Sequence, residues 1–121
     1  MDVRAGLAQL GGELREVDVT DTEAVLAACE GAHILWLESP TNPLLGIADL
    51  PRLCAFARER GILSVVDNTL CTPLLQRPLA VGADIVIHSA TKAIGGHSDL
   101  LLGAAVTKTA TGTHDCKKSA P

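Results

Sequence analysis

The sequence predicts an α/β fold with a mostly parallel sheet, and two observations support this class. Short apolar runs of strand length alternate with segments of helical periodicity along the 121 residues, and this alternation is typical of parallel strands joined by helices. The composition, with 47% hydrophobic and 20% charged residues, is that of a globular chain. At this length we expect at most one domain, with a core of modest size.

The first predicted helix follows residue 20. Thr20 and Glu23 have the spacing of a capping box, in which two side chains satisfy backbone N–H groups where a helix begins. Gly31 is expected to end this helix, because glycine readily adopts the backbone conformation that follows a helical C-terminus. A continuous apolar run then predicts a buried strand over residues 33–38, which the prolines after it bring to an end.

The clearest helical pattern covers residues 50–60. Asp49 is its expected N-cap, and Gly61 follows its C-terminus. Apolar residues recur at helical spacing and predict one buried face, made of Leu50, Leu53, Cys54 and Ala57.

Three further strands and a broken helical segment complete the predicted order. A second buried strand covers residues 62–66 and leads into Asp67, and a third covers residues 85–88. Between them, prolines interrupt residues 73–82, which are expected to form one or two short helices. A fourth strand is predicted over residues 100–106, after a pair of glycines.

Charge and cysteine usage argue against several classes of partner. Ten Lys and Arg against 14 Asp and Glu give a net charge of -4, so no basic stripe is available for nucleic acid. No apolar run approaches the ~20 residues of a membrane span, and the charged residues after Met1 are unlike a secretion signal. The four cysteines form no C-x-x-C pair, and Cys29 and Cys54 are expected to be small buried thiols. We therefore expect a cytoplasmic protein with no metal, nucleic-acid or membrane partner.

Polar side chains follow three of the predicted strands. In a parallel α/β sheet, ligands bind at the carboxyl ends of the strands. Packing alone does not call for so many polar residues at one edge, so the sequence predicts a binding site there. The three ends carry Glu38 with Asn42, Asp67 with Asn68 and Thr69, and Ser89 with Thr91 and Lys92.

The residue types at these ends match the requirements of pyridoxal phosphate. A lysine in a partly desolvated pocket, as Lys92 would be here, is an amine nucleophile toward carbonyl groups. Asp67 supplies an anion for a protonated heterocycle, and Ser89 and Thr91 supply hydroxyl donors for a phosphate. Simpler interpretations stay open for each: a turn or cap aspartate, capping hydroxyls, and a solvated lysine.

Four ordered blocks of sequence resemble one family. They are Glu38-Ser39-Pro40-Thr41-Asn42-Pro43, then Val65-Val66-Asp67-Asn68-Thr69, then Gln76-Arg77-Pro78-Leu79-Ala80 with Gly82-Ala83-Asp84, and Ser89-Ala90-Thr91-Lys92 with Gly96-His97-Ser98-Asp99. The blocks are similar to the pyridoxal-phosphate-dependent enzymes of cysteine and methionine metabolism, which include cystathionine γ-synthase, cystathionine γ-lyase, cystathionine β-lyase and methionine γ-lyase. The similarity covers residues 33–106, and four blocks in order make it highly specific.

This resemblance implies a fold and a reaction. The fold is a segment of the aspartate-aminotransferase-like (fold type I) major domain, a three-layer α/β sandwich with a mostly parallel sheet. Residues 1–107 would belong to that cofactor-binding domain, and residues 108–121 would form a tail unlike the family. The reaction is elimination or replacement at the β or γ carbon of a sulfur amino acid, with transsulfuration of the cystathionine γ-lyase or γ-synthase type favoured. Full-length relatives would form homo-oligomers.

The resemblance also implies a role for each site residue. Lys92 would hold the cofactor covalently and carry protons, and Asp67 would pair with the pyridine nitrogen. Ser89 and Thr91 would contact the phosphate. Thr69 would lie against a ring face, and Asn42 would contact the phenolic-oxygen side of the cofactor and the substrate carboxylate.

The sequence departs from the family pattern and leaves alternatives open. The chain contains no tyrosine to stack on the cofactor, and Ala93 stands where an aromatic residue is common. One alternative is therefore a truncated, non-catalytic copy that binds the cofactor weakly or acts only in association. A P-loop hydrolase would need G-x-x-x-x-G-K-[ST], which the sequence lacks. His97-Ser98-Asp99 contains the residue types of a hydrolase triad, but adjacent residues cannot converge on one atom.

Overall fold

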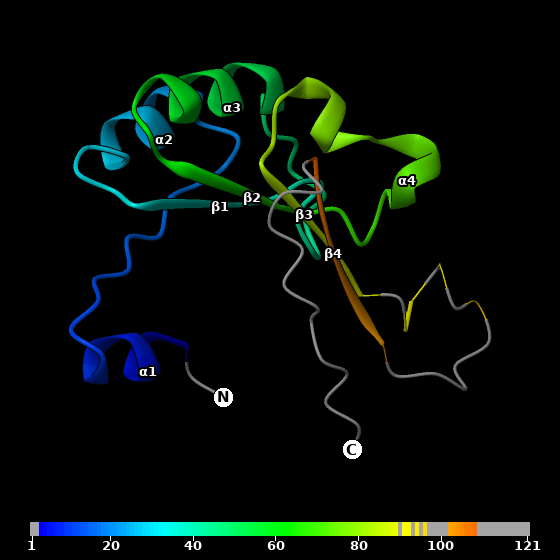
Figure 1. The fold of residues 1–121 in the computed structure, drawn as a ribbon, viewed down its shortest axis with the longest axis horizontal. Coiled ribbons are helices and arrows are strands. Elements are labelled where there is room, and N and C mark those ends of the chain that lie inside the picture. The colour runs from blue at the N-terminus through cyan, green and yellow to red at the C-terminus, as the bar shows by residue number, and fades with distance from the viewer. Residues whose placement is uncertain (1–2, 90, 93, 95, 97–101, 109–121) are drawn as a thin grey trace.

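The computed structural model describes residues 3–89, 91–92, 94, 96 and 102–108, and it confirms the α/β class. From the second helix onward, helical segments and strands alternate until the last two strands (Figure 1). In chain order they are α1 (Val3–Gln9), α2 (Thr22–Ala28), β1 (Ile34–Glu38), α3 (Leu50–Glu59), β2 (Leu63–Asp67), α4 (Thr72–Leu75), the 3-10 helix η1 (Pro78–Val81), β3 (Ile85–Ser89) and β4 (Gly103–Thr107). The one or two short helices expected over residues 73–82 are thus α4 and η1.

The sheet has the order β1-β2-β3-β4 and is mostly parallel, as predicted. β1, β2 and β3 run in the same direction, whereas β4 is antiparallel to β3. The register places Glu38 beside Asp67 and Asp67 beside Ile87. The carboxyl ends of the three parallel strands therefore meet at one edge of the sheet, where the sequence predicts a site.

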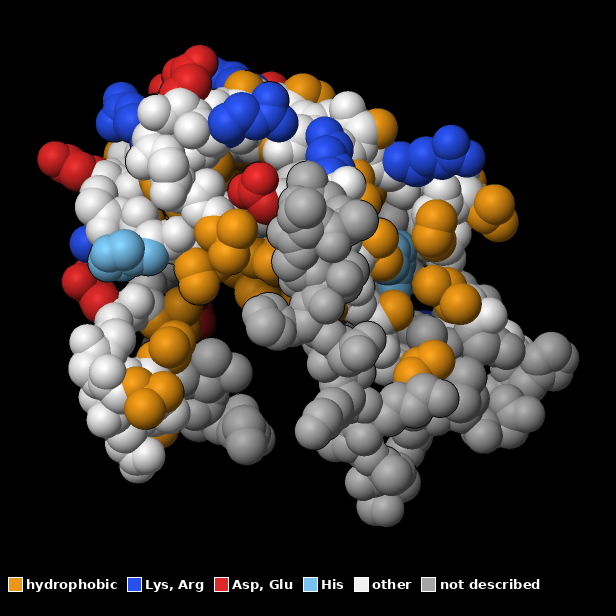
Figure 2. Space-filling model, viewed as in Figure 1, with side chains coloured by type: hydrophobic (Ala, Val, Ile, Leu, Met, Phe, Trp, Pro, Cys, Tyr) orange, Lys and Arg blue, Asp and Glu red, His pale blue; other side chains and the backbone are white. Residues whose placement is uncertain are grey.

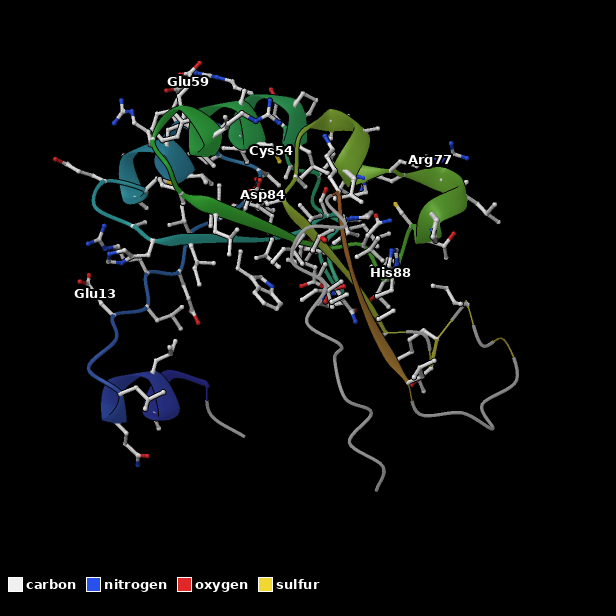
Figure 3. All side chains as sticks on the ribbon, viewed as in Figure 1. Glu13, Cys54, Glu59, Arg77, Asp84 and His88 are labelled. Carbon is white, nitrogen blue, oxygen red and sulfur yellow. The ribbon has the colours of Figure 1, made fainter. Side chains whose placement is uncertain are left out.

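A helical layer covers one face of the sheet (Figure 1). The face of α3 predicted to be buried is confirmed, and Leu53, Cys54 and Ala57 are fully buried there. Cys29 of the α2 C-cap is buried as well, so both thiols that the sequence places in the core lie there. Cys54 points from α3 toward the sheet (Figure 3). Burial raises the pKa of both thiols, which keeps them protonated and unreactive.

The opposite face of β1 is open, which corrects the prediction of a fully buried strand. Burial alternates along β1: Leu35 and Leu37 are buried, whereas Ile34 and Trp36 are 57% and 59% exposed. Side chains alternate across a strand, and the helical layer covers only one set of them. α1 lies on the other side of the sheet (Figure 1). Figure 2 shows hydrophobic side chains gathered below the helical layer, whose top carries mostly charged groups.

The start of α2 corrects a second prediction. The N-cap is Asp21 rather than Thr20, and Asp21 Oδ1 accepts a hydrogen bond from the Ala24 backbone N–H at 3.0 Å. The Thr20 hydroxyl instead donates to Asp18 Oδ1 at 2.7 Å. A carboxylate one residue further along therefore takes the capping role, which Asp performs at least as well as Thr.

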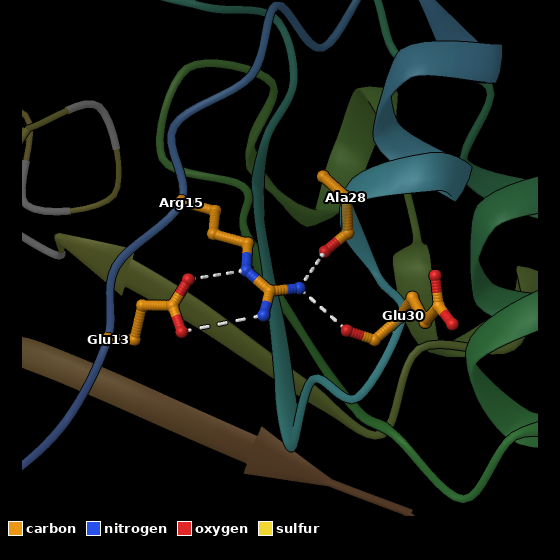
Figure 4. A network of polar contacts seen from close by, with 4 residues as sticks. All are labelled: Glu13, Arg15, Ala28 and Glu30. Carbon is orange, nitrogen blue, oxygen red and sulfur yellow. Dashed lines mark hydrogen bonds and ion pairs between the residues drawn. The ribbon is translucent and has the colours of Figure 1, made fainter.

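An arginine from the preceding segment satisfies the end of the same helix (Figure 4). Arg15 Nη1 donates to the carbonyl oxygens of Ala28 at 2.9 Å and Glu30 at 2.6 Å. Its Nε donates to Glu13 Oε1 at 2.8 Å, and this hydrogen bond lowers the pKa of Glu13. A cation near the C-terminus of a helix stabilises its unpaired carbonyl groups, so Arg15 links the N-terminal segment to the helical layer.

The ends of α3 agree with the sequence prediction. Asp49 Oδ1 accepts from the Arg52 backbone N–H at 3.2 Å, and Gly61 has a φ of 68° just after the helix. Arg58 in the last turn donates to the Gly82 carbonyl oxygen at 3.2 Å. Gly82 has a φ of 114° and ends η1, so the arginine fixes η1 against α3. Within the described residues, no helix is long and apolar enough to cross a membrane.

Candidate functional site

Asp67 and Thr69 are hydrogen-bonded to each other where β2 ends. Asp67 Oδ1 accepts from the Thr69 hydroxyl at 2.6 Å and from the Thr69 backbone N–H at 3.1 Å. Both side chains are half-buried. These two bonds form a tight turn after the strand and fix one oxygen of the carboxylate in place.

Thr69 also connects β2 to the end of β3. The Ser89 backbone N–H donates to Thr69 Oγ1 at 2.9 Å. The Ser89 carbonyl oxygen accepts from the Lys92 backbone N–H at 3.1 Å, so the chain turns directly after β3. The structure thus brings Asp67, Thr69 and Ser89 together and places Lys92, whose side chain is exposed, one turn later.

Thr91 is bonded to the start of the antiparallel strand. Its hydroxyl accepts from the Leu102 backbone N–H at 3.0 Å, and its own backbone N–H donates to the Leu102 carbonyl oxygen at 3.2 Å. The Thr91 hydroxyl therefore pairs with a backbone N–H group, as the simpler interpretation of a capping hydroxyl expects. Its contact with a phosphate stays a prediction.

Asn42 lies apart from the other predicted residues. It is exposed in the turn after β1, which Thr41 closes: the Gly46 backbone N–H donates to Thr41 Oγ1 at 2.8 Å. Thr41 in turn donates its backbone N–H to the Gly46 carbonyl oxygen at 2.9 Å. In the described part of the chain, no hydrogen bond joins the Asn42 side chain to the other five predicted site residues.

Sequence reasoning assigned no role to three polar residues that the structure places at this edge. Ser39 and Asn68 follow the last residues of β1 and β2 and are fully buried. Gln76, just after α4, bonds to both of them. All three occur in the family-like blocks, and for Ser39 and Asn68 the position directly after an apolar strand was the available signal.

An apolar cavity of about 290 Å³ lies behind the site, between the α4–η1 segment and the β3–β4 pair. Pro73, Pro78, Leu79, Val86 and Val106 form much of its wall. His88 (Figure 3) also lines it and is buried, and its Nδ1 has no hydrogen-bond partner among the described residues. None of the six predicted site residues lines this cavity, but Asn68 and Gln76 do, so the cavity borders the strand-end site. The described residues hold no group of three or more His, Cys, Asp or Glu that could bind a metal ion.

The groups at the strand ends fit pyridoxal phosphate by their chemistry. Asp67 supplies a carboxylate, Lys92 an exposed amine, and Ser89 and Thr91 hydroxyl groups, all within one turn of neighbouring strand ends. Neither Asp67 nor Lys92 forms an ion pair with another described residue. Because no described partner engages them in an ion pair, the carboxylate is available to a protonated ring nitrogen, and the lysine side chain, as the neutral amine, is available to an aldehyde. Ala90, Ala93, Gly95 and residues 97–101, including the His97-Ser98-Asp99 block, lie outside the described residues.

The sequence is similar to several curated enzymes. It is 51% identical over 92 residues to the probable cystathionine gamma-synthase of Herpetosiphon aurantiacus, covering 75% of this chain and 29% of that protein. It is 47% identical over 102 residues to the L-methionine gamma-lyase of Pseudomonas putida, covering 84% of this chain and 26% of that one. The chain thus spans roughly a quarter of the length of these relatives.

Solved structures show the same similarity. The cystathionine gamma-lyase from Lactobacillus plantarum complexed with L-serine has a TM-score of 0.84 and 44% identity, over 88% of this chain and 28% of that one. The cystathionine gamma synthase from Xanthomonas oryzae pv. oryzae in complex with cystathionine has a TM-score of 0.82 and 43% identity, with the same coverage of both chains.

The family assignment rests on a match that extends along nearly the whole chain. The sequence profile described as "Cys/Met metabolism PLP-dependent enzyme" matches residues 3–120. That range includes most of the segment expected to be unlike the family, so a domain boundary at residue 107 stays a prediction. The profile and the four ordered blocks agree: this chain belongs to the pyridoxal-phosphate-dependent enzymes of Cys/Met metabolism.

Proposed function

We propose that this chain supplies the cofactor-binding centre for pyridoxal-phosphate-dependent elimination or replacement on sulfur amino acids. The observation that carries the proposal is the hydrogen-bonded set of Asp67, Thr69 and Ser89, one turn from Lys92. The activities of its relatives, a probable cystathionine gamma-synthase and an L-methionine gamma-lyase, support the substrate class.

In this proposal, the Asp67 carboxylate would pair with the protonated ring nitrogen of the cofactor. Pyridoxal phosphate, when bound, supplies an electron sink for negative charge that develops at the substrate α-carbon. A carboxylate beside the ring nitrogen holds its proton and so maintains that sink. Thr69 anchors one carboxylate oxygen, at 2.6 Å from its hydroxyl, which keeps the anion from rotating away. Its hydroxyl also accepts from the Ser89 N–H, and its contact with a ring face stays a prediction.

Lys92 would provide the amine that holds the cofactor aldehyde and would afterwards carry protons at the substrate carbon. Ser89 and Thr91 would bind the phosphate. The Thr91 hydroxyl would donate to the phosphate while it accepts from the Leu102 backbone N–H. Asn42 donates to the substrate carboxylate from the turn after β1. Its exposed position in that turn leaves its amide accessible to an amino acid.

Replacing Asp67 by asparagine is expected to weaken pyridoxal phosphate binding about 10- to 100-fold, because a charge-assisted hydrogen bond contributes about 1.5–3 kcal/mol. The side chain keeps its size, so packing changes little. Titration of the chain with the cofactor, followed by absorbance, measures the affinity.

Asp49→Asn is the matched control for this substitution. Asp49 caps α3 on the exposed surface, and asparagine caps helices as well as aspartate does. The control is therefore expected to bind the cofactor like the parent chain. Equal affinity in Asp67→Asn would remove Asp67 from the proposed site.

The first step of the proposed reaction, removal of the substrate α-hydrogen, is tested by exchange of the cystathionine α-hydrogen with deuterium from the solvent. This partial reaction needs only the electron sink and a base, so it does not require full turnover. With pyridoxal phosphate present, the chain is expected to exceed the rate of the free cofactor, and Lys92→Ala is expected to remove the excess. A rate equal to that of the free cofactor in the parent chain would contradict the proposal.

A second candidate function, association through the open face of the sheet, is favoured by the exposure of Ile34 and Trp36. Exposed apolar patches commonly mark interaction surfaces. Trp36 is the only tryptophan in the chain, so its fluorescence reports on this face. A blue shift with rising protein concentration, without deuterium exchange above the free-cofactor rate, would support association over catalysis.

A further inference from the structure

Gln76 joins the carboxyl ends of β1 and β2 through one side-chain amide. Its Nε2 donates to the Ser39 carbonyl oxygen at 2.8 Å and to Asn68 Oδ1 at 2.9 Å. Ser39 directly follows β1, Asn68 directly follows β2, and both are fully buried. A residue from beyond α4 therefore spans two neighbouring strand ends.

Asn68 completes the arrangement with its own amide. Its Nδ2 donates to the carbonyl oxygens of Thr72 at 3.1 Å and Gln76 at 2.8 Å. Every partner of the two amide nitrogens is a carbonyl oxygen, which can only accept, so the orientation of both amides is determined. Asn68 also fastens the α4 turn to the end of β2, because it bonds to the backbone at both ends of that turn.

Ser39, which Gln76 bonds through its carbonyl oxygen, also bonds to the segment that leads from β1 to α3. Ser39 Oγ accepts from the Ala48 backbone N–H at 3.0 Å. The Asn42 turn lies between these two residues, so its ends are held by Ser39. Gln76, Asn68 and Ser39 together form an amide brace.

The amide brace lies next to the proposed cofactor-binding residues Asp67 and Thr69 but does not include them. Asp67 and Thr69 flank Asn68 in the sequence but make no side-chain hydrogen bond to Gln76, Asn68 or Ser39 among the described residues. They bond to each other and to Ser89 instead. Removing a member of the brace would leave buried carbonyl groups unpaired. It would also allow the Asp67–Thr69 turn and the Asn42 turn to shift relative to each other.

We propose that Gln76 is a positioning residue, which sets the spacing between the Asp67–Thr69 turn and the Asn42 turn. Small displacements of reacting groups are costly, since orientation can supply about 7–11 kcal/mol of a reaction barrier. This inference rests on the proposed function for its effect on the cofactor. The spacing between the two turns is a property of the chain without cofactor and can be measured there.

The first test measures amide hydrogen exchange in the cofactor-free chain with Gln76→Met, which keeps the length of the side chain and removes its donors. Exchange at Ala48, whose N–H donates to Ser39, and at Ser89, whose N–H donates to Thr69, is expected to become about tenfold faster, the effect of one lost hydrogen bond. The Ala57 amide, inside α3, is expected to stay unchanged. Gln9→Met in exposed α1 is the matched control and is expected to alter neither turn. No change at Ala48 and Ser89, or equal acceleration at Ala57, would overturn the proposal.

A second measurement needs no variant and covers the case in which Gln76→Met does not fold. In the parent chain, the side-chain amide protons of Gln76 and Asn68 are expected to exchange much more slowly than those of exposed Gln9. Equal exchange of the Gln76 and Gln9 side-chain protons would show that the brace does not form in solution.

The third arm adds pyridoxal phosphate carrying an isotopically labelled pyridine nitrogen. Gln76→Met is expected to lower the cofactor affinity about tenfold, again the effect of one hydrogen bond, and to move the nitrogen resonance toward that of the neutral ring as Asp67 shifts. An unchanged resonance and affinity would overturn the positioning role. If the parent chain binds no cofactor, the proposed function fails, and the exchange measurements alone then decide whether Gln76 spaces the two turns.

Discussion

Lys92→Ala is expected to abolish covalent attachment of pyridoxal phosphate to this chain. An amine and an aldehyde form a carbon–nitrogen double bond with loss of water, and borohydride reduces that bond to a stable amine. Lys92 comes in the turn directly after Ser89, so it lies one turn from the strand end whose Asp67 and Ser89 would hold the ring and the phosphate. After borohydride treatment with the cofactor, peptide mass analysis is therefore expected to find the label on Lys92.

Lys108 provides the matched control for this labelling. It follows β4 on the exposed surface, and Lys108→Ala is expected to leave the labelling of Lys92 intact. Label distributed evenly over Lys92, Lys108 and the two later lysines would show that the amines react by exposure alone. Unchanged total labelling in Lys92→Ala would have the same meaning.

Leu53→Ala is expected to destabilise the chain by about 2–5 kcal/mol, the range for buried Leu→Ala changes. Leu53 is fully buried in α3 and belongs to the core between the helical layer and the sheet. The total stability of a folded domain is only about 5–15 kcal/mol. A loss of this size would therefore unfold a large share of the molecules in mild denaturant.

Urea titration followed by circular dichroism measures this change in the free energy of unfolding. Leu74→Ala is the matched control, because Leu74 is 88% exposed in α4, and its effect is expected to lie within about 0.5 kcal/mol. Equal midpoints for the two variants would mean that α3 does not pack on the sheet as described.

Much of the fold could be predicted from the sequence because its signals are local. The buried face of α3 follows from helical periodicity, and Asp49 caps that helix through a bond to a residue only three positions away. The apolar runs place the strands β1, β2 and β3 to within a residue or two at each end. Parallel order then predicts that Asp67 and Ser89 share one edge of the sheet, and the register confirms it.

Only the tertiary structure decided which side chains are covered and which polar groups pair. Ile34 and Trp36 belong to the same apolar run as Leu35 and Leu37, but they are exposed because the helical layer covers one face of β1. Gln76 bonds to Ser39 across 37 positions of sequence. Such a bond depends on how α4 is placed against two strand ends, and no local pattern of residues encodes that placement.

The candidate site likewise combines features that the sequence predicted with features that only the structure showed. The residue types at the strand ends and the ordered family-like blocks named Asp67, Thr69, Ser89 and Lys92 from the sequence. The structure added that Thr69 bonds to both Asp67 and Ser89 and that the Thr91 hydroxyl is bonded to Leu102. Composition and spacing determine which groups a chain offers, whereas hydrogen bonds between distant segments determine which of those groups are held in place, because they form only once the sheet has assembled.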